Sequence, residues 1–142
     1  MKKLNESEIE YRNNNISGPK YLLRGPYCDV GLVIIQPGED FNTHYHQNTE
    51  EDFYTLEGKV DIYVDGKKIV ISEGDIIQLP PPTKHYIKNN YDKPWKALFV
   101  KAPFHEKDKV NVDWLPEEDK GHALRRFLWR ILPGRCERAH HG

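Results

Sequence analysis

The interpretation of this chain starts from one stretch, PGEDFNTHYHQNTEEDFYTLEG, which spans residues 37–58. His44 and His46 are separated by a single residue, so on a β-strand both imidazoles project from the same face. Their Cα atoms are then about 7 Å apart, which lets two ring nitrogens reach one ion. Glu51 follows the polar turn Gln47–Thr49 and opens the next strand. A chain reversal at this turn would bring its carboxylate beside the two imidazoles.

A fourth candidate ligand, His85, lies in a later stretch, PPPTKHYIKNN, at residues 80–90. It would have to be delivered by an adjacent strand of a closed barrel. Three neutral imidazoles and one carboxylate suit a divalent ion of Mn, Fe, Co, Ni, Cu or Zn, and the missing thiolate argues against a structural zinc knuckle. Any one of these side chains alone is more simply explained as an ordinary polar residue. The four together predict one bound transition-metal ion.

Short apolar runs alternate with turn signals from about residue 21 to 101, which predicts an all-β sandwich or barrel rather than βαβ units. The expected strands are Asp29–Ile35, Asn42–His46, Asp52–Leu56, Lys59–Val64, Lys67–Ile71, Ile76–Leu79, Lys84–Lys88 and Trp95–Lys101.

The clearest hairpin is IYVDGKKIV, residues 62–70. Asp65 and Gly66 supply the two positive-φ residues of a type I′ turn, with β-branched residues on either side. In its first arm Ile62 and Val64 share one face, while polar and aromatic residues occupy the other. This period of two predicts a half-buried strand.

The two ends of the chain differ from the β region. Residues 1–20 are polar and Asn-rich and are expected to form an N-terminal arm, followed by a barrel over 21–116. In the tail, 117–142, a helical apolar stripe predicts a short C-terminal helix at 120–131. Three interpretations of this tail stay open: a helix packed on the barrel or on another subunit, a basic amphipathic helix on a membrane surface, or a segment foreign to the parent protein.

Two motifs in the β region resemble those of the cupin superfamily. The first cupin motif runs Gly, five residues, His-x-His, three or four residues, Glu, six residues, Gly. In this chain it is matched by Gly38, His44, His46, Glu51 and Gly58. The second motif runs Gly, five residues, Pro-x-Gly, two residues, His, three residues, Asn. It is matched by Gly74, Pro80, His85 and Asn89, with Pro82 where glycine is usual.

This resemblance, to small single-domain cupins of type 2, covers roughly residues 29–101. It implies a single double-stranded β-helix, or jelly-roll, barrel that holds a metal through His44, His46, Glu51 and His85. Proline is fixed near φ −65° and cannot adopt the backbone of the usual glycine, so we expect an extended turn through Pro80–Pro82.

Residues that share a face with the expected ligands are the candidate substrate-binding residues. They are Asn42, Phe53, Thr55, Ile87 and Asn89, the last taken from the second motif. The cavity they outline is apolar and aromatic with few charges, and Arg24 is the only candidate anion anchor in the barrel. Phosphorylated sugars and dicarboxylates usually require an arginine clamp. The pattern therefore favours a small neutral or singly charged substrate.

The resemblance implies a metal-dependent enzyme in which the ion acts as Lewis acid or redox centre and Glu51 serves as a catalytic base. Dioxygenase-type chemistry is our first hypothesis, and a lyase, isomerase or decarboxylase that uses the ion only as Lewis acid is the nearest alternative. A non-catalytic module that binds a metal or small ligand is the third. Fold alone does not distinguish them.

The composition and charge of this 142-residue chain limit its possible partners and cellular location. A net charge of −1 gives no electrostatic footprint for nucleic acid. The N-terminus has no apolar stretch, no segment reaches the length of a membrane span, and the two cysteines lack any C-x-x-C spacing, so we expect a cytoplasmic protein. Pairing into a homodimer is expected because a barrel of this kind offers an open sheet edge. A 16.7 kDa species in light scattering would exclude it.

Overall fold

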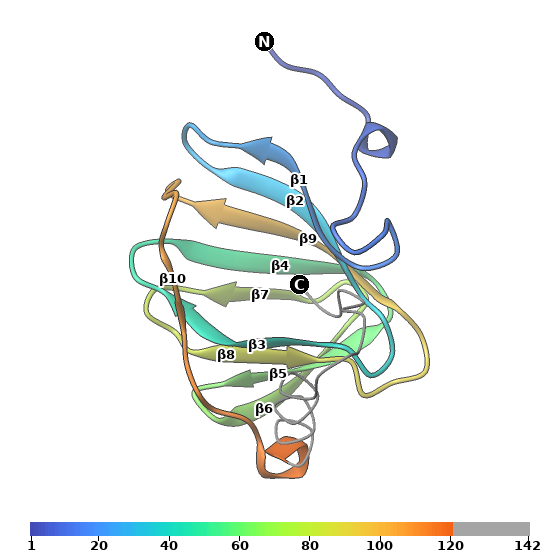
Figure 1. The fold of residues 1–142 in the computed structure, drawn as a ribbon, viewed down its shortest axis with the longest axis vertical. Helices are drawn as coiled ribbons and strands as arrows, with labels where there is room; N and C mark the ends of the chain where they lie inside the picture. Colours follow the sequence, from blue (N-terminus) through green and yellow to red (C-terminus); the bar gives the residue numbers. More distant parts are fainter. Residues whose placement is uncertain (121–142) are drawn as a thin grey trace, which may run out of the picture.

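The computed structural model describes residues 1–120, and within them the chain forms two five-stranded antiparallel sheets (Figure 1). The first sheet has the order β1-β2-β9-β4-β7 and the second β10-β3-β8-β5-β6. The bounds in the first sheet are β1 Gly18–Arg24, β2 Asp29–Ile35, β9 Trp95–Ala102, β4 Glu50–Glu57 and β7 Ile76–Leu79. Those in the second are β10 Lys109–Asn111, β3 Asp40–His46, β8 His85–Lys88, β5 Lys59–Val64 and β6 Lys67–Ser72.

The expectation of an all-β double-stranded β-helix is confirmed. The described residues contain only two short 3₁₀ turns besides the strands, η1 at Glu6–Glu8 and η2 at Glu117–Asp119. None of the helical turns in this part of the chain has the length or the apolar character to span a bilayer. The C-terminal helix predicted for 120–131 falls on residues that lie, from 121 onward, outside the described part.

Alternation of apolar residues along the strands builds one core between the two sheets. On β9, Trp95, Ala97 and Phe99 point inward and are buried, as a period of two requires. The opposite sheet contributes aliphatic side chains such as Val60 and Ile62 from β5. Because both sheets turn an apolar face to the same interior, burial of this surface stabilises their packing.

Two strands were missed by the sequence analysis, and both lie at sheet edges. β1 pairs with β2 although it carries no clean alternation, and β10 is a three-residue strand that pairs with β3. Gly31 of β2 lies opposite both Tyr21 of β1 and Phe99 of β9. A Cβ at this position would lie 2.4 Å from the Phe99 ring, so glycine is required where these two aromatic rings meet edge to face.

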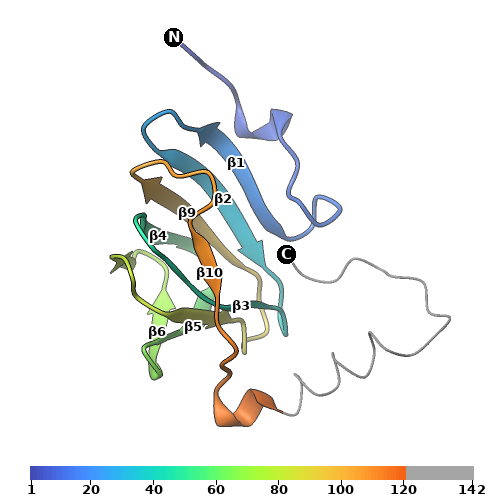
Figure 2. The same cartoon turned by 60° about the vertical axis from the view of Figure 1, so that its left-hand side comes forward.

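The hairpin prediction is confirmed, but the half-burial of its first arm is wrong. Asp65 and Gly66 both have positive φ, as a type I′ turn requires, and join β5 to β6. Tyr63 and its neighbour Asp61 on the outer face of β5 are nonetheless buried. The reason is that the segment after β10 runs along the second sheet to η2 and places the Trp114 ring 6.0 Å from that of Tyr63 (Figure 2).

The turn before His85 also differs from the expected extended path. It closes as a turn in which the Thr83 amide donates to the Pro80 carbonyl at 2.9 Å, with a cis peptide between Pro81 and Pro82. The turn thus replaces the glycine-dependent geometry of the motif with another compact one, and β8 still begins at His85.

Candidate metal centre

The structure brings together the four side chains that the sequence singled out as ligands. His44 and His46 lie on β3, and His85 on β8 is the cross-strand partner of His44 in the same sheet. Glu51 comes from β4 in the other sheet. All four are buried, and one potential ligand atom from each lies within 4.8 Å of the others. The cluster therefore joins the two sheets at one end of the barrel.

One carboxylate oxygen is the centre of this cluster. Glu51 Oε1 lies 3.3 Å from the Nε2 atom of His85, 3.6 Å from that of His46 and 3.9 Å from that of His44. These separations are those expected of atoms that surround a common point. An ion with ligand bonds near 2.1 Å would place its ligand atoms about 3 Å apart, close to what is observed.

The imidazoles are oriented to present their Nε2 atoms to this point. His44 Nδ1 lies 2.7 Å from the Asn42 carbonyl, and His85 Nδ1 lies 3.0 Å from the Thr83 carbonyl. Because a carbonyl only accepts, each Nδ1 carries the proton and leaves the lone pair of Nε2 facing the centre. His46 Nε2 is buried without a hydrogen-bond partner. A buried nitrogen that lacks a hydrogen-bond partner and lies beside the lone pairs of two other imidazoles fits a bound cation.

The charges of the cluster also fit a cation. Burial raises the pKa of Glu51, but the three imidazoles beside its carboxylate and the charge of Lys101 outweigh this effect and hold the pKa well below its usual value. Burial likewise lowers the pKa of His44, more than the neighbouring carboxylate raises it. An ionised carboxylate and a neutral imidazole are the forms that bind metals.

Lys101 holds the other oxygen of the carboxylate. Its Nζ lies 3.3 Å from Glu51 Oε2 and donates to the Tyr21 hydroxyl at 2.8 Å. Burial alone would lower the pKa of Lys101, but the charge of Glu51 and then Tyr21 raise it, so the ammonium persists. With Oε2 engaged in this way, Oε1 is the oxygen directed at the imidazoles.

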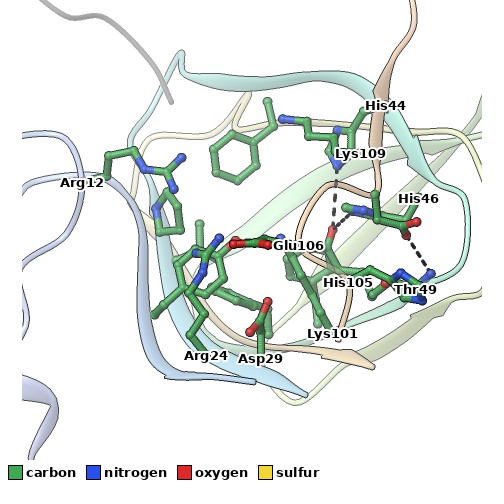
Figure 3. Close-up of a pocket in the computed structure, with 18 residues that line it drawn as sticks. Arg12, Arg24, Asp29, His44, His46, Thr49, Lys101, His105, Glu106 and Lys109 are labelled. Carbon is green, nitrogen blue, oxygen red and sulfur yellow. Dashed lines mark hydrogen bonds and ion pairs between the residues drawn. The ribbon is translucent and has the colours of Figure 1, made fainter. Parts of the chain in front are cut away.

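The cluster opens into a cavity of about 260 Å³ (Figure 3). His44, His46 and Glu51 line it, whereas His85 lies behind them, with its ring centroid 4.3 Å from that of His44. Apolar side chains line the inner part, among them Phe41, Phe53 and Phe99. A cavity of this size suits a small ligand.

The expectation of an apolar cavity with few charges is wrong. Four cationic and four acidic side chains line it: Arg12, Arg24, Lys101 and Lys109, and Asp29, Glu51, Glu106 and Asp108. The error has a simple cause. Five of the eight come from parts of the chain that the sequence analysis did not place at the cavity: the two missed edge strands, the N-terminal segment and the loop before β10. They are Arg24, Lys109, Arg12, Glu106 and Asp108.

The predicted substrate-binding residues occupy different places. Phe53 lines the cavity. Thr55 and Ile87 share its inward orientation but lie deeper in the core, where Thr55 accepts a hydrogen bond from Trp95 Nε1 at 3.0 Å. Asn42 is exposed because the register of β3 shifts between residues 41 and 44, which reverses the alternation there.

Asn89 is fully buried in a turn, away from the cavity. Its side-chain amide donates to the carbonyls of Ile35 and Lys93, and its oxygen accepts from the Tyr91 amide. The bonds to Lys93 and Tyr91 close the turn after β8, and the bond to Ile35 ties this turn to the end of β2 in the other sheet. The contacts of Asn89 thus serve the fold of this turn.

Two of the missed cavity residues carried a signal in the sequence. Lys101 continues the inward-facing series 95, 97, 99 on β9, and Asp29 begins the inward series that leads to Val33 and Ile35 on β2. The same period of two that predicted the core therefore pointed to them. Arg12 and Lys109 had no such signal, because neither lies on a strand with an apolar alternation.

Asp108 ties the β3–β4 turn to the loop before β10. Its carboxylate accepts hydrogen bonds from the amides of Asn48 and Thr49 at 2.8–3.1 Å. Burial opposes ionisation, but these bonds lower the pKa of Asp108 to about 2. The turn that separates His46 from Glu51 is held in place from outside.

Replacing Asp108 with Asn is expected to reduce the free energy of unfolding by about 1–3 kcal/mol at neutral pH, because charged acceptors for two amides are lost. Since the pKa is lower in the folded state than its ordinary value of 3.8, this stabilisation is present above about pH 4 and lost as the pH falls toward 2. Urea unfolding across this range measures it. Asp113→Asn, at an exposed position, is the control; equal losses in both variants would contradict the assignment.

Comparison with known proteins gives a consistent family signal. The family model described as "Cupin domain" matches residues 31–101. Polyketide synthase CurC of Streptomyces cyaneus is 30% identical over 81 residues, which cover 57% of this chain and 53% of CurC. The chain thus spans about half the length of that relative. A solved double-stranded β-helix protein from Klebsiella pneumoniae superposes with a TM-score of 0.69 at 17% identity, covering 80% of this chain and 99% of the other.

Two Bacillus subtilis enzymes match over smaller parts of their length. Quercetin 2,3-dioxygenase is 38% identical over 48 residues, 34% of this chain and 14% of the enzyme. Oxalate decarboxylase OxdC is 32% identical over 89 residues, 59% of this chain and 23% of the enzyme. The relatives of the chain therefore include enzymes with different reactions.

Proposed function

The chain belongs to the cupin family, and from this premise we propose that it is a metal-dependent enzyme that acts on a small molecule at the open side of the four-residue cluster. One observation carries the proposal: three imidazoles and one carboxylate converge, buried, at the base of a cavity that reaches solvent. A purely structural cluster would not need a cavity beside it. Pairing into a homodimer stays a prediction.

The ion would be held by His44, His46, Glu51 and His85. Bound there, a divalent transition metal supplies Lewis acidity and, where it is iron, copper or nickel, a centre for dioxygen chemistry. Four protein ligands leave room for substrate on a five- or six-coordinate ion. Phenylalanine side chains line the inner cavity and offer an apolar surface to a bound substrate.

We place oxygenase-type chemistry first. An N₃O ligand set is compatible with redox-active metals, and the similarity to a quercetin dioxygenase supports the proposal without establishing it. In this reaction class the chain itself has to bind and orient the substrate and to keep Glu51 ionised. Lys101 performs the second task through its contact with Oε2.

A Lewis-acid isomerase, lyase or decarboxylase is the second candidate, and one observation favours it. Lys101 and the Tyr21 hydroxyl form a hydrogen-bonded pair in the cavity wall, beside Glu51. Such a pair can hold a proton at the edge of a bound substrate, which proton-transfer reactions need and oxygen insertion does not.

Metal analysis combined with oxygen-uptake assays tests the proposal. We expect about one transition-metal ion per chain and, for the first candidate, oxygen consumption with one class among phenols, diketones and thiols. A redox-inert native ion with no oxygen uptake would eliminate the oxygenase and leave the Lewis-acid enzyme. Absence of any bound metal, or an ion whose water does not exchange, would contradict enzymatic function at this site and favour a binding module.

A further inference from the structure

A row of alternating charges crosses the first sheet and ends at the metal centre. Arg24 on β1 is the cross-strand partner of Asp29 on β2, which pairs with Lys101 on β9, which in turn pairs with Glu51 on β4. Cross-strand partners lie on the same face about 5 Å apart. Within this row Lys101 and Glu51 form an ion pair, and Arg24 and Asp29 have an opposite charge on the neighbouring strand.

Two cations of the cavity stand outside this row. Lys109 on β10 is the cross-strand partner of His46, on the second sheet, and Arg12 reaches the cavity from the N-terminal segment. The backbone of Arg12 is fixed by a hydrogen bond from its amide to the Pro19 carbonyl at 3.0 Å. Figure 3 shows the two side chains on different sides of the same pocket.

Neither cation has a carboxylate within ion-pair distance among the residues the structure describes. The two acidic residues of the nearby loop do not serve them. Asp108 is engaged by the amides of the β3–β4 turn, and Glu106 is exposed without an ion pair to either cation. Arg12 and Lys109 are both exposed to solvent where they line the cavity.

The balance of charge changes when the centre is loaded. Cationic and acidic side chains in the cavity lining are equal in number, so a divalent ion leaves the site with two uncompensated positive charges. A ligand that carries negative charge compensates them, and two unpaired cations at the mouth are placed to bind it.

We propose that Arg12 and Lys109 bind an anionic group of the substrate, a carboxylate or a phosphate, while another part of that molecule faces the four-residue cluster. This inference rests on the proposed function and adds the substrate class. An arginine contributes a planar two-pronged donor and a lysine a point charge, which together suit an oxyanion. The substrate is therefore an acid or a phosphate ester rather than a neutral molecule.

The test measures anion binding by calorimetry at low ionic strength, with malonate and inorganic phosphate as probes, on metal-free and metal-loaded protein. The variant R12Q/K109Q is compared with K3Q/K107Q, which removes two exposed lysines from the same segments, neither of them in the cavity lining. We expect R12Q/K109Q to bind the preferred anion at least about 10-fold more weakly than the wild type. The control should stay within about twofold.

The outcomes separate this inference from the proposed function. Preference for malonate identifies a carboxylate, and preference for phosphate a phosphate ester. Wild-type protein that binds metal but neither anion, or a variant that binds them as the wild type does, overturns the inference and leaves the metal enzyme standing. Anion binding that depends on Arg12 and Lys109 in a protein that takes up no metal supports the anion site and overturns the proposed function.

Discussion

Replacing His85 with alanine is expected to lower the affinity for a divalent transition metal by at least about 100-fold, since loss of an outer-shell partner alone typically costs 10–100-fold. His85 Nε2 lies 3.3 Å from Glu51 Oε1 and is oriented by the Thr83 carbonyl. No other imidazole in the described part of the chain belongs to the cluster besides His44 and His46. The site therefore has no replacement ligand.

Competition with a chelating indicator measures this affinity, and metal-dependent thermal stabilisation provides a second readout. We expect metal to raise the melting temperature of the wild type and to leave that of His85→Ala almost unchanged, because a ligand stabilises only the state that binds it. His105→Ala is the matched control: this histidine also lines the cavity but lies outside the cluster. Equal affinities in the two variants would falsify the assignment of His85 as a ligand.

The inner strands were predictable because they carry a repeating pattern with a physical cause. An inner strand is a short apolar run whose residues alternate between buried and partly exposed, as on β9 from Trp95 to Val100, and its ends follow from the turns. β1 and β10 lie at sheet edges and lack this alternation. These two strands form because their backbones pair with β2 and β3, and the local side-chain pattern does not predict this pairing.

In the candidate site, too, the local sequence pattern predicted some residues and not others. Spacing within β3 and β4 was enough to bring His44, His46 and Glu51 together, because a strand fixes the side on which each residue projects. The alternation predicts which side chains point inward but not how deep they lie. Thr55 points inward like Phe53 but lies in the core beyond the cavity. The charges at the mouth come from segments whose position depends on the whole fold, so the sequence alone led to a wrong estimate of the polarity of the cavity.

Replacing Lys101 with methionine is expected to lower metal affinity, or catalytic turnover once a substrate is known, by about 10–100-fold, as for other groups that orient a ligand. The substitution keeps the aliphatic stem but removes the ammonium 3.3 Å from Glu51 Oε2. Among the described residues, the carboxylate then has no lysine left within ion-pair distance, and Oε2 is no longer held in place. Lys101 acts through Glu51, so it is a positioning residue.

A metal-affinity measurement by competition distinguishes this role from a general loss of stability. Lys96→Met, on the same strand but outside the cavity lining, removes the same charge and serves as the control. Lys101→Arg should recover part of the affinity, because its guanidinium also donates to a carboxylate. If Lys101→Met binds metal as the wild type does and only unfolds more easily, the side chain supports the fold of the sheet and does not orient Glu51. In that case the contact between Lys101 and Glu51 would contribute to stability and not to metal binding.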